Sequence, residues 1–325
     1  MKFIDSEQVR KQMNKAASQQ TPFFFTINYE MSEGLFIENP MNQSEILFHF
    51  KGIDNKSSKL TSCQKIKLTV HPIAKKEYRL KFQIAQQGLK SGEMNVINLT
   101  SRTPISTNIN CREIFFRSQS PYRIYVPGKF VCFSPERFVK IENGIISSNP
   151  MKGTIDAAVP NAAQLVLSDT KEISEHTATV QLVAEELSSV AHNVAIKRFR
   201  YIDQIESQNR TLLQVSSEIE GQLPNNYMTR LGDIIFSLLP AASITGSPKT
   251  KTEEYIRLAE AQPRGYYCGI AGYFDGKKLD TTVLIRFIEI DGKNMFFRSG
   301  GGVTSDSVCE KEYQEVLDKI YLPII

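Results

Sequence analysis

Runs in which apolar and polar side chains alternate recur along most of this chain. A period of two places successive side chains on opposite faces of an extended strand, so these runs predict β-strands. Two of them, 138–141 and 143–147, meet at Asn143-Gly144, a dipeptide typical of tight hairpins. A second hairpin is predicted around Pro127-Gly128. The predicted strands are 23–29, 46–50, 66–71, 96–100, 114–116, 122–126, 130–133, 138–141, 143–147, 269–274, 281–290 and 293–298, with more strand inside 198–217.

Fewer stretches show apolar side chains at the three- and four-residue spacing of a helix. The clearest stripe is Val180, Val183, Leu187 and Val190, inside 170–194. The predicted helices are 7–17, 77–88, 170–194, 228–238, 249–261 and 307–319. Because strands are many and long helices are few and late, we predict an α+β protein with mostly antiparallel sheets rather than alternating βαβ units.

Composition narrows the class of protein. Hydrophobic residues make up 41% of the 325 residues and charged residues 23%, which is ordinary for a globular protein with a sizeable core. A net charge of +4 is too small to indicate a nucleic-acid partner, and no apolar stretch is long enough to predict a membrane span. The opening residues lack the pattern of a secretory signal. Five widely spaced cysteines without a Cys-x-x-Cys pair indicate reduced thiols, so we predict a cytoplasmic protein.

The stretch Pro150-Met151-Lys152-Gly153-Thr154 is the strongest candidate for chemistry. A stiff proline and a permissive glycine flank the lysine just beyond the predicted hairpin, which suits the presentation of one side chain in a cleft. Taken alone, such a lysine is more simply a surface residue in a loop. Glu136 lies at the far end of the same hairpin. It is the first of several features that favour a lysine presented in a cleft over a simple surface lysine.

Two predicted helices each carry a pair of glutamates three residues apart. The pairs are Glu172 with Glu175 and Glu312 with Glu315. Carboxylates near a helix N-terminus also stabilise the helix dipole, which is the simpler role of the first pair. If the two pairs converge, they form an all-oxygen site of the kind that Mg²⁺ prefers.

A run of glycines and one arginine could bind the carboxylate of an anionic substrate. Gly300, Gly301 and Gly302 would offer backbone N–H groups, and Arg286 would offer two parallel donors. Taken alone, the glycines are more often a turn and Arg286 an ordinary strand residue. Dinucleotide-binding, P-loop, zinc-protease and serine-nucleophile motifs are missing from the sequence.

Together these motifs resemble those of the chorismate-utilising enzymes, a family that includes anthranilate, isochorismate and salicylate synthases and component I of aminodeoxychorismate synthase. The resemblance covers roughly three quarters of the chain, in family order. It rests on 134–138, 150–154, 171–176, 243–249, 264–269, Arg286, 299–302 and 312–315. It implies a two-lobed α+β fold, an antiparallel β-sandwich core with outer helices. Residues 78–325 would be the chorismate-binding catalytic domain and 1–77 a reduced N-terminal part of the same fold.

Lys152 directs the resemblance to component I of aminodeoxychorismate synthase, because anthranilate synthases generally carry alanine at this position. The implied reaction is the Mg²⁺-dependent amination of chorismate at C4 by ammonia. It gives 4-amino-4-deoxychorismate, a precursor of para-aminobenzoate and folate. In this resemblance Lys152 is a covalent nucleophile and Glu136 is the general acid for the departing hydroxyl.

The resemblance also implies the binding roles. The metal ligands would be Glu175 and Glu315, with Glu172 and Glu312 beside them. The enolpyruvyl carboxylate would be held by Tyr267, Arg286, Gly300, Gly301 and Gly302, while Ser243 and Thr245 line the site. A separate glutamine amidotransferase subunit would supply the ammonia.

Two positions depart from the family pattern. Val96 stands where members that add water carry a lysine base and ammonia-using members usually carry glutamine, which argues against isochorismate or salicylate synthesis. Gln214 stands where many members carry a histidine associated with pyruvate elimination, which disfavours anthranilate synthesis. Two alternatives stay open. One is anthranilate synthase component I, and the other is a catalytically inactive subunit that binds chorismate or a partner.

Overall fold

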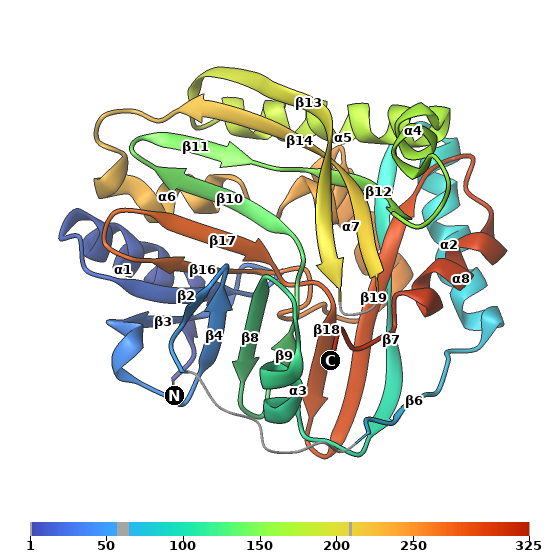
Figure 1. Ribbon diagram of the computed structural model, residues 1–325, viewed down its shortest axis with the longest axis horizontal. Coiled ribbons are helices and arrows are strands. Elements are labelled where there is room, and N and C mark those ends of the chain that lie inside the picture. The colour runs from blue at the N-terminus through green and yellow to red at the C-terminus, as the bar shows by residue number, and fades with distance from the viewer. Residues whose placement is uncertain (1, 57–64, 208–209, 325) are drawn as a thin grey trace.

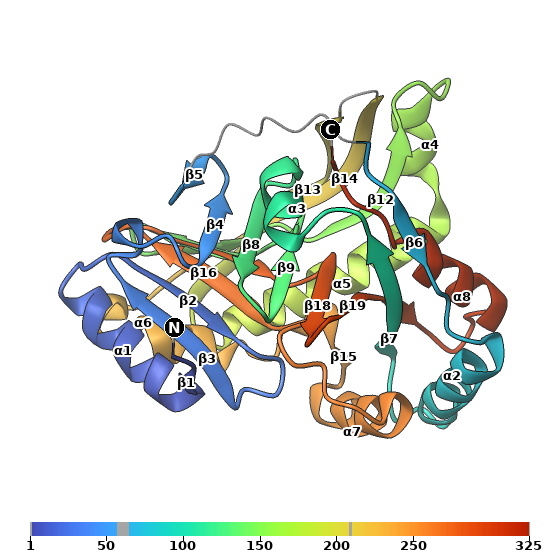
Figure 2. The ribbon, with the colours of Figure 1, turned by 90° about the horizontal axis from the view of Figure 1, so that it is seen from below.

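The computed structural model describes residues 2–56, 65–207 and 210–324. Two large antiparallel sheets form its centre, and the strands of one run crosswise to those of the other in Figure 1. Most helices lie on the outside of the two sheets (Figure 2). The predicted α+β class with antiparallel sheets is confirmed.

The first sheet has the strand order β1-β3-β2-β16-β17-β10-β11-β14-β12, and β13 pairs with the other edge of β14. Its strands are β1 (Ile4–Asp5), β2 (Phe23–Ile27), β3 (Glu33–Glu38), β10 (Arg137–Glu142), β11 (Ile145–Ser148), β12 (Met151–Asp156), β13 (His192–Ser207), β14 (Arg210–Gln222), β16 (Ile270–Phe274) and β17 (Leu279–Val283). The β10–β11 hairpin turns at Asn143 and Gly144, which both have positive φ, as the sequence predicts.

The second sheet has the order β15-β7-β19-β18-β9-β8-β4-β5, and β6 also pairs with β7. Its strands are β4 (Leu47–Phe50), β5 (Ile53–Asp54), β6 (Leu68–Val70), β7 (Val96–Thr107), β8 (Tyr122–Val126), β9 (Phe130–Cys132), β15 (Gly246–Ser247), β18 (Phe287–Asp291) and β19 (Asn294–Val303). Residues before 78 therefore contribute strands to both sheets.

The α-helices of the described residues are α1 (Ser6–Ser18), α2 (Lys75–Lys90), α3 (Cys111–Arg117), α4 (Ala162–Ser168), α5 (Thr170–Ser188), α6 (Leu231–Ser237), α7 (Lys249–Glu260) and α8 (Cys309–Asp318). Short 3₁₀ turns lie at Pro40–Asn42, Tyr227–Arg230 and Ala242–Ile244. Helix α5 packs on β13 and β14, and α8 packs on β19, so each helix that carries a glutamate pair covers a different sheet. Among the described residues, no helix has both the length and the apolar character needed to cross a bilayer.

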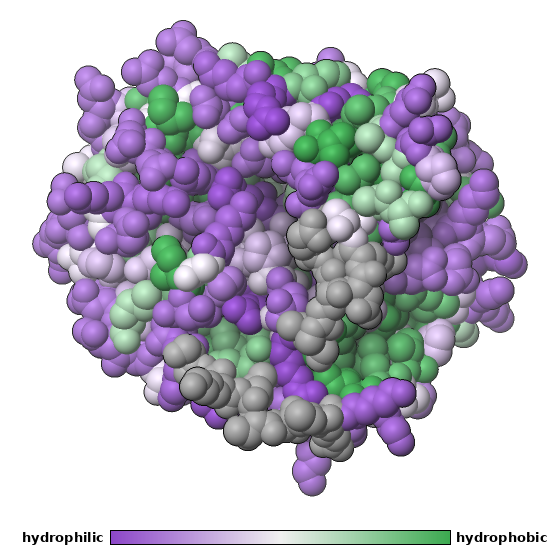
Figure 3. Space-filling model, viewed as in Figure 1, coloured by the Kyte–Doolittle hydropathy of each residue, from purple (hydrophilic) through white to green (hydrophobic). Residues whose placement is uncertain are grey.

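Aromatic side chains fill the space between the two sheets. The rings of Phe24 on β2 and Phe48 on β4 stack at 4.9 Å, and Phe50 packs edge-on against Tyr122 at 5.5 Å. All five residues of β2 are buried, because α1 covers the face that points away from this core. Figure 3 shows a mostly hydrophilic outer face with separate apolar patches, and most of the large apolar side chains are buried.

Several local predictions are wrong. Residues 114–116 are helical in α3, where Asn110 caps the helix by accepting a hydrogen bond from the Glu113 N–H at 2.9 Å. The helix predicted over 170–194 ends at Ser188, and 281–290 forms two strands separated at Leu284–Arg286, where Arg286 has φ +53°. Cys111, Cys132, Cys268 and Cys309 are free thiols, and Cys63 lies outside the described residues.

Candidate active site

A cleft of about 490 Å³ opens where β12 of the first sheet faces β7 and β19 of the second. It brings together twelve of the thirteen predicted site residues from segments far apart in the sequence. They are Glu136, Lys152, Glu172, Glu175, Ser243, Tyr267, Arg286, Gly300, Gly301, Gly302, Glu312 and Glu315. The exception is Thr245, whose side chain is fully buried and does not line the cleft.

Lys152 projects into this cleft from β12, near its start. The sequence predicts that a stiff proline and a permissive glycine present this lysine just beyond the hairpin, and the structure places it within a strand that pairs with β14. Its Nζ lies 3.9 Å from Glu175 Oε2 on α5, and 37% of its side chain is exposed. The lysine therefore faces a carboxylate while remaining accessible to a substrate.

Glu136 is held by its backbone just before β10. Its N–H donates to Ser134 Oγ at 3.2 Å, and its carbonyl accepts from Thr282 Oγ1 at 2.7 Å. Burial raises the pKa of its carboxyl to about 7, although the positive charges of Lys152 and Lys319 and a hydrogen bond from Ser243 act to lower it. A carboxyl with this pKa is partly protonated at neutral pH, as a general acid must be.

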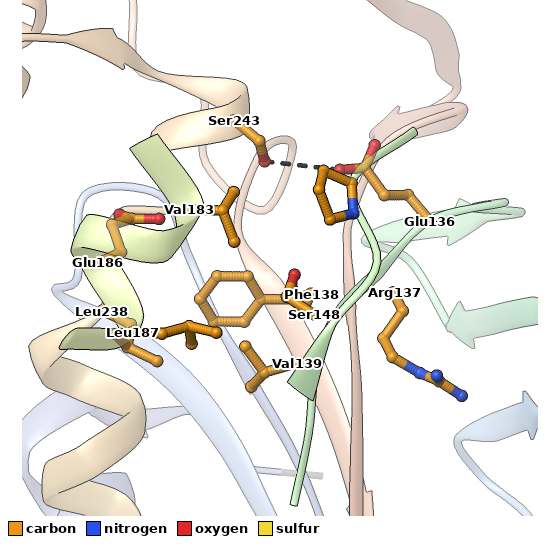
Figure 4. A pocket seen from close by; sticks show the side chains of 11 residues that line it. Glu136, Arg137, Phe138, Val139, Ser148, Val183, Glu186, Leu187, Leu238 and Ser243 are labelled. Atoms are coloured by element: carbon orange, nitrogen blue, oxygen red, sulfur yellow. Dashed lines mark hydrogen bonds between the residues drawn. The ribbon is translucent and has the colours of Figure 1, made fainter. Parts of the chain in front are cut away.

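A second, much smaller cavity of about 20 Å³ lies behind Glu136. Figure 4 shows Phe138, Val139, Val183, Leu187 and Leu238 gathered on this side of the carboxylate. The long 3.5 Å contact from Ser243 Oγ to Glu136 Oε1 closes its upper edge. These apolar side chains explain why burial has so large an effect on the pKa of Glu136.

The two glutamate pairs reach the cleft from opposite sides, on α5 and α8. Within the described residues, no group of three or more acidic, histidine or cysteine side chains is close enough to enclose a metal ion. Mg²⁺ usually takes only one or two protein carboxylates and completes its shell with water and substrate oxygens. The donors therefore fit a magnesium ion that binds together with an anionic substrate, rather than one in a preformed protein cage.

The far end of the cleft contains positively charged side chains and backbone polar groups that point into it. Gly300–Gly302 are not a turn, since they continue β19 in register with β7. The Gly300 carbonyl accepts a hydrogen bond from Lys319 Nζ at 2.7 Å. Because Lys319 lines the cleft, the Gly300 carbonyl points towards the cleft. Because the N–H and C=O of one strand residue point to the same side, the Gly300 N–H also faces the cleft and can donate to an anion.

Arg286 and Tyr267 complete this end. Arg286 donates from Nη1 to the Lys319 carbonyl at 3.0 Å, and its guanidinium lies 4.8 Å from the Tyr321 ring centre. The Tyr267 side chain is buried, and burial raises the pKa of its hydroxyl well above the usual range, so the hydroxyl stays a hydrogen-bond donor at neutral pH. Both residues suit the recognition of a carboxylate.

Sequence reasoning missed two cations that line the cleft. Lys319 lies one helical turn after Glu315, and its Nζ is 2.6 Å from Glu315 Oε1. A lysine four residues after a glutamate on a predicted helix could have been recognised from the sequence as its ion-pair partner. Arg298 is almost fully buried and pairs with Glu289 at 2.6 Å. The alternating pattern of its strand gave no sign that this face lines a cleft.

The fold and the cleft together define a two-sheet α+β protein whose cleft is lined by charged side chains of both signs. The family model for the chorismate binding enzyme matches residues 36–324, so the chain belongs to that family. The similarity anticipated from the motifs is thereby confirmed.

Individual relatives agree with this assignment. An "uncharacterized PabA-like protein" of Haemophilus influenzae is 43% identical over 316 residues, which span 97% of this chain and 96% of that protein. Aminodeoxychorismate synthase component 1 of Salmonella typhimurium is 30% identical over 260 residues, which span 75% of this chain and 56% of that enzyme. The menaquinone-specific isochorismate synthase of Escherichia coli has the same fold, with a TM-score of 0.74 at 15% identity over 98% of this chain and 82% of that one.

Proposed function

We propose that this chain acts as an aminodeoxychorismate synthase component I, which aminates chorismate at C4 with ammonia to give 4-amino-4-deoxychorismate. The observation that carries the proposal is that Lys152 and Glu136 line one cleft. Lys152 is close enough for its charge to lower the pKa of Glu136, which burial otherwise raises. The two groups that the proposed reaction needs are thus within reach of one substrate, and Lys152 would have to lose its proton before it attacks.

The proposed chemistry has two steps. In the first, Lys152 Nζ bonds to C2 of the ring, the double bonds shift, and the C4 hydroxyl leaves as water after Glu136 protonates it. In the second, ammonia bonds to C4, the double bonds shift back, the bond between C2 and the Lys152 nitrogen breaks, and a proton from the new C4 ammonium group returns to Glu136. The sum is chorismate and ammonia going to aminodeoxychorismate and water, with the lysine regenerated.

The other cleft residues would bind and orient the substrate. Glu175 and Glu315 would hold Mg²⁺, with Glu172 and Glu312 beside them. When bound, the ion supplies positive charge that neutralises the ring carboxylate. Tyr267, Arg286 and the backbone N–H groups of Gly300 and Gly302 would hold the enolpyruvyl carboxylate at the other end, since the Gly301 N–H points to β7. Ser243 would support Glu136.

Two residues in the cleft argue against other reactions of the family. Val96, which lines the cleft, cannot act as the base that members adding water require. Gln214 has no titratable group that could assist pyruvate loss.

The deciding experiment is incubation of the purified chain with chorismate, ammonium and Mg²⁺, followed by mass spectrometry of the products. We expect a product that retains the enolpyruvyl group. Lys152→Ala should reduce its formation by roughly 100-fold or more, because loss of an obligatory covalent route raises the barrier by on the order of 3 kcal/mol.

The matched control is Lys197→Ala, since Lys197 is an exposed lysine on β13. It should behave like the unchanged enzyme. Anthranilate as the product would instead identify an anthranilate synthase. No turnover under any condition would favour a binding subunit.

A further inference from the structure

The strand that carries Lys152 is irregular at this residue. Met151 pairs with Ser216 and Thr154 pairs with Gln214, so Lys152 and Gly153 together face the single residue Val215. Two residues opposite one make a β-bulge, which leaves backbone groups without ladder partners and re-aims the side chains beside it. The direction of Lys152 therefore depends on what holds this bulge.

Gln214 bonds to two consecutive residues of the bulged strand. Its Nε2 donates to the Gly153 carbonyl at 3.0 Å, and its Oε1 accepts from Thr154 Oγ1 at 2.7 Å. Because a carbonyl can only accept, the Gly153 bond fixes which way the amide points. The side chain thus supplies the hydrogen bond that the irregular ladder cannot give to Gly153.

The bulge is confined on its other sides as well. The Ser217 N–H donates to the Pro150 carbonyl at 3.1 Å, which fixes the strand before the bulge. Gly153 has φ +76°, and a Cβ there would lie 3.1 Å from Val166 on α4 and 3.2 Å from Glu172 Oε2 on α5. The backbone is therefore held between Gln214 and two helices, and loss of Gln214 frees only one side.

We propose that Gln214 is a positioning residue that holds the Lys152–Gly153 bulge and so aims the Lys152 amine at the substrate. The kinetic part of this proposal rests on the proposed function. Gln214 acts through Lys152, so its loss should slow the chemical step more than it weakens chorismate binding. Thr154 shares the role through its hydroxyl.

The test uses Gln214→Met, which keeps the length of the side chain and removes both hydrogen bonds. We expect kcat for amination to fall by about 10- to 100-fold, as for a reacting group misplaced by about 1 Å, while KM for chorismate changes by less than about threefold. Thr154→Val should give a smaller fall in kcat, and Thr154→Ser should restore the rate. The control is Gln204→Met, an exposed glutamine on neighbouring β13.

A double variant tests whether Gln214 acts through the lysine. In a Lys152→Ala background, Gln214→Met should cause no further loss of rate, because there is no amine left to aim. An equal loss in both backgrounds would overturn the positioning role. If Lys152→Ala alone keeps full amination, the proposed function has lost its nucleophile.

Hydrogen exchange followed by mass spectrometry gives a readout that needs no turnover. Gln214→Met should speed exchange in the peptide covering 151–156 and leave peptides from β7 and β19 unchanged. Unchanged exchange at 151–156, or an unchanged kcat in an enzyme that needs Lys152, would overturn the proposal. If Gln214→Met does not fold, the Thr154→Val and Thr154→Ser pair decides in the same assays.

Discussion

At the scale of single residues, the surroundings of Glu136 determine its acidity. Apolar side chains on the side of the small cavity destabilise the charged form of the carboxyl group. Lys152, Ser243 and Lys319 stabilise that charged form. The balance leaves a pKa of about 7, compared with 4.5 for an ordinary glutamate. Such a group gives up its proton in the pH range in which an enzyme normally works.

We expect the rate of amination to fall as the pH rises through about 7, because the acid must start protonated and loses its proton above its pKa. The rate should be measured at constant free ammonia, since ammonia itself becomes more abundant as pH rises. Ser243→Ala should move this fall to higher pH, because the hydrogen bond that lowers the pKa is lost. A wild-type profile that is flat across neutral pH would contradict the acid role.

At the scale of elements, two helices bring the glutamate pairs to the cleft and the sheets hold those helices. His176 on α5 bonds through Nε2 to Ser217 Oγ on β14 at 2.6 Å. Burial, with help from the charges of Arg200 and Lys152, lowers the pKa of His176 to about 4, so the ring stays neutral. Tyr313 on α8 donates to the Ile73 carbonyl at 2.8 Å. Each pair of carboxylates therefore stands on a fixed support.

Removal of the metal should abolish turnover and leave the fold intact. We expect protein treated with EDTA to be inactive and to recover when Mg²⁺ is added. Glu175→Gln and Glu315→Gln should each weaken Mg²⁺ binding by about tenfold or more in calorimetry with chorismate present. Glu185→Gln, an exposed position on α5, is the control. Full turnover after EDTA treatment would rule out the metal.

A buried ion pair fixes the corner between α7 and β7 beside the cleft. Arg264 Nε donates to Glu260 Oε2 at 3.0 Å, and both side chains are 1% exposed. Arg264 also donates to the Ile244 carbonyl at 3.0 Å, while Glu260 accepts from the Thr100 N–H at 2.9 Å. These bonds tie α7 to the second sheet.

Arg264→Met should lower the free energy of unfolding by about 3–5 kcal/mol, because it leaves the Glu260 carboxylate buried without its partner. Urea unfolding followed by circular dichroism measures the change. Arg257→Met, at an exposed position on α7, should change the same quantity by less than about 0.5 kcal/mol. Similar losses in the two variants would mean that the buried pair adds nothing specific.

At the scale of the whole molecule, the two sheets enclose a site for chorismate, and the supply of ammonia is a separate question. Ammonium predominates over free ammonia at neutral pH, so an ammonia-using synthase gains from a glutaminase that delivers ammonia directly. Burial raises the pKa of the Cys132 and Cys268 thiols, which makes both poor nucleophiles for glutamine hydrolysis. This agrees with the proposal of a separate amidotransferase subunit.

We expect glutamine alone to give no turnover with the isolated chain, whereas ammonium at high pH does. Adding a cognate amidotransferase should enable turnover with glutamine, and the complex need not have a large permanent interface. Product formation followed by mass spectrometry measures both. If the highly purified chain used glutamine unaided, it would contain a nucleophile of its own, and Cys132 and Cys268 would be the first to replace.

The sequence by itself determined those features that depend on short-range pattern. Alternation defines most strands, because each strand has one face in the core, and Asn143-Gly144 defines its hairpin because both residues tolerate positive φ. The glutamate pairs share a helix face for the same local reason. Family order of the motifs then gave the candidate site, and all of its residues except Thr245 line the cleft.

Only the tertiary structure decided the features that depend on pairing between distant segments. The glycines 300–302 extend because β7 pairs with them, and the apolar run 114–116 lies in a helix that packs on β8 and β9. The Lys152 bulge arises from register against β14, a strand some sixty residues away in sequence, as the Thr154–Gln214 pairing shows. The pKa of Glu136 reflects side chains from several elements. Short-range patterns contain none of this, since register and burial belong to the assembled chain.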